Sequence, residues 1–350
     1  MNTTQKKDKK NLNWGELNFQ YTPTEHRFVA YHDGERWDEG ELTESKYITI
    51  EEGSTCLHYG QQCFEGMKAY SAKNGDVLIF RPDKNAARMA RTAKRLLMPS
   101  VPEALFIKGV TEAVKANYSS IPPHGTGSTL YIRPLLIGIG DNLGLKTAPK
   151  FMFRVFVSPV GPYYKTGKLN TISLALTDYN RSAPQGIGDI KAGANYAGGL
   201  DSTIRAKALG ADEAIYFDPL EGKYLDEIGS ANIIAVMKGN VLATPKSDTI
   251  LPSITRESLM IIAEKKLGMA TEHRQIEFLK EFPDMLEMAA CGTAAVLSPV
   301  AKILVNNKWY RFVSEEKGEP GPIITKLYDY LVGIQNGDLE DEFSWVYKVM

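Results

Sequence analysis

The chain has 350 residues, of which 43% are hydrophobic and 10% aromatic, so it can bury a sizeable core and fold as two domains or one large one. Its 41 Lys and Arg nearly balance 42 Asp and Glu, which leaves a formal net charge of −1. No global field therefore draws the protein to nucleic acid or to an anionic membrane, and we expect small molecules as its partners.

The first 14 residues are polar and rich in lysine, with no apolar stretch. This composition argues against a secretory signal or membrane anchor and indicates a solvated tail. No arginine precedes Arg27, whereas organelle transit peptides are rich in arginine, so we expect a cytoplasmic protein. Cys56, Cys63 and Cys291 lack paired metal spacing and are odd in number, which predicts free thiols and no metal site.

The first half of the chain alternates strand-like and helix-like segments, which is an α/β pattern. In chain order, the predicted elements are strands over 27–34, 46–53 and 77–82, a helix over 84–97 capped by Asp83, a helix over 103–118, and buried strands over 129–138 and 150–158.

Residues 159–169 interrupt this pattern with proline and glycine, and we predict that they connect an N-terminal domain, 1–158, to a C-terminal domain, 170–350. The C-terminal domain contains a second set of predicted elements. They are a strand over 169–178, a helix over 199–210, a strand over 213–218, a hairpin over 232–245 and a helix over 255–268.

Two glycine clusters, at residues 138–144 and 186–193, resemble nucleotide-binding loops at first sight. Neither has G-x-G-x-x-G spacing that leads into a helix, and no G-K-[ST] follows a glycine-rich loop. Tight turns explain these glycines, so dinucleotide or Walker-type binding is not predicted.

Lys191 lies among small residues in the segment GDIKAGANYAGG, just ahead of a predicted helix. A lysine that forms a Schiff base needs close backbone approach around a planar ring and a lowered pKa, and such a setting suits both. An exposed loop lysine is the alternative, because most lysines lie at the surface.

Other parts of a pyridoxal 5'-phosphate (PLP) site are also present in the sequence. The pyridine nitrogen of this cofactor needs an acid, its phosphate needs a helix N-terminus or an arginine, and its phenolate oxygen needs a donor. Glu227, Thr255, Arg88 and Tyr196 would supply these groups. Each also has a purely structural explanation: a surface acid, a helix cap, part of a basic helix face, and a core aromatic.

Eight sequence blocks, taken in order, resemble the signature blocks of branched-chain aminotransferases of PLP fold type IV, from about residue 15 to the end of the chain. Eight blocks in order are far more specific than one. The blocks are LHYGQQCFEGMKAY, FRPDKNAARM, YIRPLLIG, SPVGPYY, DIKAGANYAGGL, LDEIGSANI, LPSITRESL and CGTAAVLSPV.

The resemblance implies a role for each matching residue at the cofactor. Lys191 matches the Schiff-base lysine, Glu227 the acid on the pyridine nitrogen, and Tyr196 the tyrosine on the phenolate oxygen. The residues that match the phosphate-binding set are Arg88, Ile254, Thr255 and Thr293, with Ile254 and Thr255 acting largely through backbone amides.

Further matching positions concern the substrate. Tyr131 and the amides of Thr293 and Ala294 match groups that hold the α-carboxylate, and Arg133 matches the arginine that receives the side-chain carboxylate of glutamate. The residues that match the lining of the apolar pocket are Phe19, Tyr59, Phe64 and Tyr163, with Tyr59 contributed by the neighbouring subunit.

The chain departs from the animal members of this family at two places. Where they carry a C-x-x-C pair, this sequence has Ala295 and Ser298, so we expect no thiol switch there. The loop after Tyr163 also differs from the animal pattern, which leaves the shape of the substrate entrance open.

The resemblance implies a two-domain fold of α/β and α+β class, with a smaller N-terminal α/β domain and a larger C-terminal domain of mixed sheet and barrel character. It further implies a homodimer with PLP at the domain junction. The reaction would be transamination between leucine, isoleucine or valine and 2-oxoglutarate, giving branched-chain 2-oxoacids and glutamate. Lys191 would carry the cofactor and, as the free amine, move the substrate proton.

Two other functions remain to be weighed. D-amino-acid aminotransferases and aminodeoxychorismate lyases share the lysine and the glutamate, but they lack the YIRP and CFEGMKAY blocks. A catalytically inactive dimer kept for protein interaction would not need Lys191, Glu227 and the phosphate-binding set. A purified protein without a PLP absorbance band would favour that last function.

Overall fold

The computed structural model describes residues 8–161, 169–312 and 318–350. The chain forms two compact units, the first drawn from the described parts of Met1–Lys165, Lys191–Gly193 and Gly333–Met350, and the second from those of Thr166–Ile190 and Ala194–Val332. Neither unit is continuous in sequence. The domain boundaries at residues 158 and 170 stay a prediction, and most of the predicted connection lies outside the described residues.

The first unit is built on an antiparallel sheet, in the order β17-β5-β4-β6-β7-β1-β2, with β3 paired to β6. Its strands are β1 (Arg27–His32), β2 (Glu41–Thr43), β3 (Gln62–Phe64), β4 (Met67–Ser71), β5 (Val77–Phe80), β6 (Thr129–Ile139), β7 (Lys150–Val160) and β17 (Val346–Lys348). Its helices are α1 (Thr55–His58), α2 (Pro82–Arg95) and α3 (Glu103–Ala116), with short 3-10 turns η1 (Trp14–Glu16) and η2 (Tyr118–Ser120).

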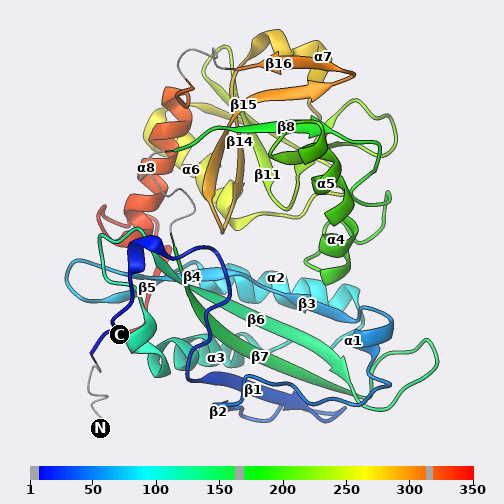
Figure 1. Ribbon diagram of the computed structural model, residues 1–350, viewed down its shortest axis with the longest axis vertical. Helices are drawn as coiled ribbons and strands as arrows, with labels where there is room; N and C mark the ends of the chain where they lie inside the picture. Colours follow the sequence, from blue (N-terminus) through cyan, green and yellow to red (C-terminus); the bar gives the residue numbers. More distant parts are fainter. Residues whose placement is uncertain (1–7, 162–168, 313–317) are drawn as a thin grey trace. The chain divides into compact units, whose positions relative to one another are not determined.

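Helices α2 and α3 cover one face of this sheet (Figure 1). Successive residues of β7 belong to opposite faces: Phe153 packs in the layer that contains Phe106 of α3, whereas Met152 packs with Ile137 on the other side. The rings of Phe106 and Phe153 are stacked, with centroids 5.8 Å apart. The long apolar strands therefore have both faces covered, as their near-continuous hydrophobic sequence indicates.

The strand predicted over residues 46–53 is wrong. Within this segment the amide of Tyr47 donates to the hydroxyl of Ser45, and that hydroxyl donates to the carbonyl of Tyr47, each at 3.2 Å. Because a nearby side chain and not a neighbouring strand satisfies this backbone, the alternating pattern does not give a strand, and β2 ends at Thr43.

The helix predicted over 84–97 is confirmed as α2, but its predicted cap is wrong. Arg81 adopts a left-handed conformation with φ of 46°, and Pro82 occupies the first helical position, where its missing N–H is not needed. Asp83 therefore lies inside the first turn, where its carboxylate interacts favourably with the helix dipole.

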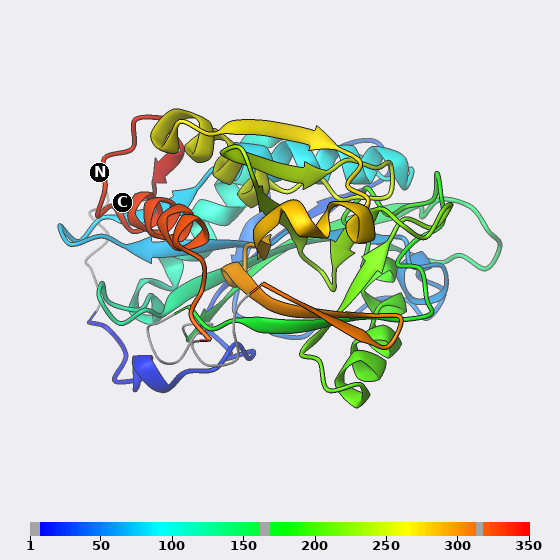
Figure 2. The same cartoon turned by 90° about the horizontal axis from the view of Figure 1, so that it is seen from above.

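The second unit contains a mixed sheet in the order β10-β9-β8-β15-β14-β11-β12-β13, with β16 paired to β15. The strands of the second unit are β8 (Ile172–Leu176), β9 (Glu213–Phe217), β10 (Leu225–Ile228), β11 (Asn232–Met237), β12 (Val241–Pro245), β13 (Ala270–Arg274), β14 (Met285–Gly292), β15 (Val296–Val305) and β16 (Lys308–Arg311). Figure 2 shows β12 and β13 running in parallel. The remaining helices are α4 (Gly193–Gly198), α5 (Leu200–Ala208), α6 (Ile254–Leu267), α7 (Phe278–Glu281), η3 (Phe282–Asp284) and α8 (Pro322–Asn336).

The other predicted elements are present with small shifts at their ends, and the mixed α/β fold class is confirmed. Helix α6 shows why its boundaries are readable from sequence. The side chain of Ser253 accepts a hydrogen bond from the amide of Arg256 at the start, and Gly268 ends the helix in a left-handed conformation. Among the described residues, no helix is long and apolar enough to cross a membrane.

Gly109 lies in α3 where the helix touches the sheet, and we predict that Gly109→Ala destabilises the protein. A Cβ atom at this position would lie 2.6 Å from a ring carbon of Phe28 and 3.2 Å from the ring of Phe153. Overpacking costs about 1–3 kcal/mol, which exceeds the roughly 1 kcal/mol by which alanine favours a helix over glycine. The measurement is the urea midpoint of unfolding.

The matched control is Gly198→Ala in α4, where an added Cβ meets nothing within 4 Å. Its stability should be unchanged or slightly raised. A Gly109→Ala variant as stable as this control would show that Phe28 moves aside without cost.

Candidate active site

Lys191 belongs to the first unit, and its backbone is bonded to β3 and α2. The amide of Phe64 donates to the carbonyl of Lys191 at 3.3 Å, and the amide of Lys191 donates to Thr92 Oγ1 at 3.1 Å. Cys63 and Ala192 form an isolated antiparallel bridge beside these bonds. The position of the lysine is therefore fixed by main-chain contacts on both sides.

The side chain of Lys191 is half-buried, and its amine lies 4.7 Å from the centroid of the Phe64 ring. The pKa of Lys191 is lowered to about 8, mainly by burial and also by the positive charge of Arg88, while the negative charge of Glu65 opposes this fall. A substantial fraction of this amine is neutral near physiological pH. Lys191 is thus suited to act as a nucleophile or a base.

Arg88 of α2 is held by a carboxylate that the sequence analysis did not identify. Its Nε donates to Glu65 Oε1 at 2.8 Å, and its Nη2 donates to Glu65 Oε2 at 2.7 Å. Asn85, one turn earlier on α2, also donates to Glu65 Oε2 at 2.7 Å. Nothing in the spacing of these residues along the chain indicates the pair, because 23 residues separate Glu65 from Arg88.

Several residues assigned to the substrate pocket come together in the first unit. The rings of Phe19 and Tyr131 meet edge to face, with centroids 5.2 Å apart. Arg133 Nη2 donates to the hydroxyl of Tyr131 at 3.2 Å, and its guanidinium carbon lies 4.7 Å from the centroid of the Phe64 ring. Three aromatic rings and the guanidinium group of Arg133 therefore lie close together.

The remaining two pocket residues are not part of this cluster. Tyr59 follows α1, is 44% exposed, and donates its hydroxyl to the carbonyl of Leu143. Tyr163 lies outside the described residues.

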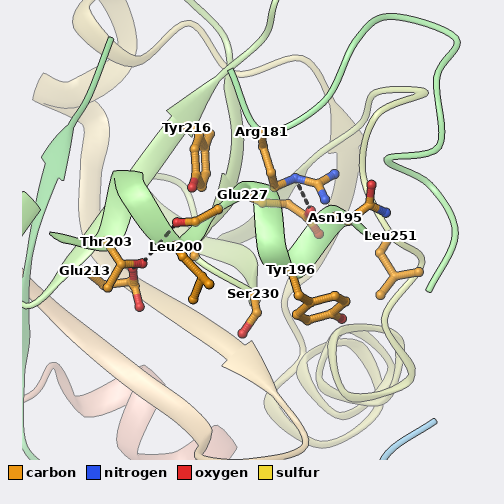
Figure 3. A pocket seen from close by; sticks show the side chains of 12 residues that line it. Arg181, Asn195, Tyr196, Leu200, Thr203, Glu213, Tyr216, Glu227, Ser230 and Leu251 are labelled. Carbon is orange, nitrogen blue, oxygen red and sulfur yellow. Dashed lines mark hydrogen bonds and ion pairs between the residues drawn. The ribbon is translucent and has the colours of Figure 1, made fainter. Parts of the chain in front are cut away.

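Glu227 of β10 is the buried acid of the second unit, with only 3% of its surface exposed. Arg181 Nε lies 2.6 Å from Glu227 Oε2 (Figure 3). Asn232 Nδ2 donates to Glu227 Oε1. Arg181 is itself fixed by donating to the carbonyls of Gly188, at 3.1 Å, and Thr249. Burial raises the pKa of Glu227 to about 8, and the charge of Arg181 opposes this rise.

Glu227 and Tyr196 line one cavity of the second unit, whose volume is about 290 Å³. Figure 3 shows both side chains in this cavity, with Arg181 and Asn195 beside them. Two residues assigned to the cofactor from sequence therefore line the same cavity, and their roles stay a prediction. A buried acid with a raised pKa at a cavity wall is a common feature of catalytic sites.

The other residues assigned to phosphate and carboxylate binding lie at backbone features of the second unit. Ile254 and Thr255 begin α6, and the turn between β14 and β15 contains Thr293 and Ala294. Val296 follows this turn with φ of 65°, an unfavourable conformation for a β-branched residue. Such strain costs about 1–3 kcal/mol and is concentrated at functional sites. The sequence analysis did not identify Val296.

Comparison with known proteins identifies the family. The model of the family "Amino-transferase class IV" matches residues 62–303. The chain is 48% identical to a branched-chain-amino-acid aminotransferase of Haemophilus influenzae, over 97% of this chain and 99% of the relative. It belongs to the class IV aminotransferases. A similar enzyme of Helicobacter pylori is 42% identical, over 97% of this chain and 98% of the relative.

Solved structures of class IV aminotransferases share this fold. A branched-chain aminotransferase of Thermoproteus uzoniensis, crystallised with norvaline, is 26% identical with a TM-score of 0.76, over 94% of this chain and 100% of the other. The family and the fold class implied by the eight sequence blocks are therefore confirmed.

This class IV aminotransferase should resist mild oxidation. Burial raises the pKa of Cys291 to about 12 and also raises the pKa of Cys56 and of Cys63. Since the thiolate is the form that peroxide attacks, we expect activity to survive mild peroxide nearly unchanged. The test is an assay before and after peroxide, and again after dithiothreitol. A large loss that dithiothreitol restores would reveal a thiol switch and contradict this expectation.

Proposed function

We propose that the chain is a PLP-dependent enzyme that moves amino groups between leucine, isoleucine or valine and 2-oxoglutarate. Its products would be branched-chain 2-oxoacids and L-glutamate. The observation that carries the proposal is the amine of Lys191, fixed beside Phe64 with its pKa lowered to about 8, in a class IV aminotransferase whose curated relatives bear the name of this activity.

The donor set fits PLP. Lys191 would hold the cofactor covalently, Glu227 would hold the proton on its ring nitrogen, and Tyr196 would donate to its phenolate oxygen. When bound, PLP supplies a reactive aldehyde and an electron-withdrawing ring that acidifies the α-proton of an amino acid. The residues proposed for its phosphate are Arg88, Ile254, Thr255 and Thr293.

Glu227 is suited to this role because its carboxylate is already fixed. Arg181 and Asn232 each contact one oxygen, so the side chain cannot turn away from the cavity that it lines. Lys191 acts at the other reactive position. Its neutral amine takes the proton from the substrate α-carbon and later returns a proton, which is general base and general acid catalysis by one group.

The substrate residues support two kinds of side chain. Phe19, Phe64 and Tyr131 offer aromatic surface for leucine, isoleucine or valine, and Arg133 offers a charge partner for the side-chain carboxylate of glutamate. The norvaline of the Thermoproteus structure has an apolar side chain of similar size. The α-carboxylate would bind Tyr131 and the amides of Thr293 and Ala294.

Two further parts of the proposal concern assembly and location. We propose a homodimer in which Tyr59, exposed in a single chain, reaches the pocket of the neighbouring subunit, and in which Tyr163 lines that pocket. We also propose that the enzyme works in the cytoplasm on small-molecule substrates. A division into a smaller N-terminal and a larger C-terminal domain, joined near residues 159–169, belongs to the same proposal.

The visible absorption spectrum tests the function. The purified protein with PLP should show the band of a lysine-bound cofactor, and leucine alone should convert it to the pyridoxamine form. Adding 2-oxoglutarate should then restore the original band and release glutamate. D-leucine is the control and should leave the spectrum unchanged. A band that D-leucine converts and L-leucine does not would favour a D-amino-acid aminotransferase instead.

The pKa of Lys191 predicts how cofactor attachment depends on pH. Only the neutral amine attacks the aldehyde, so the rate of attachment should rise with pH and level off just above pH 8, not near 10.5. Stopped-flow mixing of cofactor-free protein with PLP measures this rate. Borohydride should then fix the cofactor mass to the peptide that contains Lys191, and Lys191→Ala should show no such label. Labelling of another lysine would overturn the assignment.

A further inference from the structure

Glu65 is a fully buried carboxylate that has no role in the function described so far. It lies between β3 and β4, and its own amide donates to the carbonyl of Pro134 in β6 at 2.8 Å. Its side chain reaches α2, where it accepts hydrogen bonds from Asn85 and Arg88. The residue therefore connects the sheet to the helix at the level of Arg88.

The contact between Glu65 and Arg88 fixes an orientation as well as a distance. Two parallel bonds, of 2.8 and 2.7 Å, join the planar guanidinium to the planar carboxylate. Arginine has several rotatable bonds and loses about 2 kcal/mol of rotamer entropy when it is ordered. Because Glu65 already orders Arg88 in the folded protein, the binding of a ligand to Arg88 does not have to offset this loss of rotamer entropy.

Asn85 makes the geometry of this pair more specific. It stands three residues before Arg88 on α2, so both side chains lie on one face of the helix. Its Nδ2 donates to the same oxygen, Glu65 Oε2, that Arg88 Nη2 contacts. With three side-chain donor bonds from one helix face, the carboxylate has a single favourable orientation.

We propose that Glu65 is a positioning residue that holds the Arg88 guanidinium in one orientation to receive the phosphate of the cofactor. This inference rests on the proposed function, because it assumes that Arg88 binds that phosphate. The competing explanation is a buried ion pair that contributes only to stability. The two explanations differ in what a change at Glu65 does to a ligand without a phosphate.

The experiment compares the dissociation constants of PLP and of pyridoxal, which lacks the phosphate, for the full-length protein. Glu65→Asp keeps the charge and shortens the side chain by one methylene, so it disturbs the two parallel bonds. We expect the preference for PLP over pyridoxal to fall about ten- to a hundredfold, the size of a charge-assisted hydrogen bond, with pyridoxal affinity nearly unchanged. Equal losses for both ligands would overturn the proposal in favour of a structural pair.

The matched control is Asp83→Asn on the same helix. Asp83 is exposed and pairs with Lys84, so the variant loses one acidic charge near the start of α2 without touching the buried pair. Its preference for PLP should equal that of the wild type. A fall as large as that of Glu65→Asp would show that a change near the start of α2 lowers the preference without disturbing the bonds between Glu65 and Arg88, and would overturn the proposal.

A double-mutant cycle checks that Glu65 acts through Arg88. In an Arg88→Met background, Glu65→Asp should cause no further fall in the preference for PLP, because the group that it positions is gone. Additive losses would mean that Glu65 acts by another route. If the wild type shows no preference for PLP over pyridoxal, the phosphate site and the proposed function fail together, whereas a preference that Glu65→Asp leaves intact removes only the role of Glu65.

Glu65→Gln tests the electrostatic effect of Glu65 on Lys191 separately from the positioning of Arg88. Removing the negative charge should lower the pKa of Lys191 further, so the pH midpoint for cofactor attachment should shift below that of the wild type, while Glu65→Asp should leave it nearly in place. A midpoint that stays fixed in a folded Glu65→Gln variant would contradict the placement of Glu65 next to the reactive amine.

Discussion

A carboxylate removed from water must be paired, because the cost of burying an isolated charge amounts to several kcal/mol. Each unit of this protein contains one such carboxylate at its functional position. Glu65 is fully buried in the first unit, and Glu227 is almost fully buried in the second. Both are held in the same way, by one arginine and one asparagine. The elements that supply these partners can therefore not move independently of the acid that they hold.

The two pairs have the same contacts, but the member with the proposed chemical role differs between them. In the second unit the acid has the proposed chemical role, and Arg181 keeps it oriented and limits the rise in its pKa. In the first unit the arginine has the proposed chemical role, and the acid keeps it oriented. The neighbouring amine of Lys191 responds to both members of that pair, since Arg88 lowers its pKa and Glu65 opposes the change. Burial is the main cause of the lowered pKa of the lysine, and these two local charges adjust it.

Much of the fold could be predicted from sequence where one strong local pattern decides it. Strands β6 and β7 are long apolar runs, and α6 carries its own start and stop signals. The strand prediction over 46–53 was wrong because the alternation of polar and apolar residues does not indicate which groups satisfy the backbone. The candidate site residues came largely from the eight family blocks. Glu65 and Arg181, which contact Arg88 and Glu227, were not predicted, because each contacts its partner only in the folded chain. Glu65 and Arg88, for example, are 23 positions apart in sequence.

The C-terminal strand β17 pairs with β5, and Val77 exchanges hydrogen bonds with the backbone of residues Val349 and Met350. The sheet that begins at Arg27 is therefore completed by residues more than 300 positions later. During synthesis on the ribosome, where domains usually fold as they emerge, this sheet keeps an unpaired edge at β5 until residues 346–350 have emerged. Until then β5 presents unpaired backbone groups, with which a strand of another chain can pair.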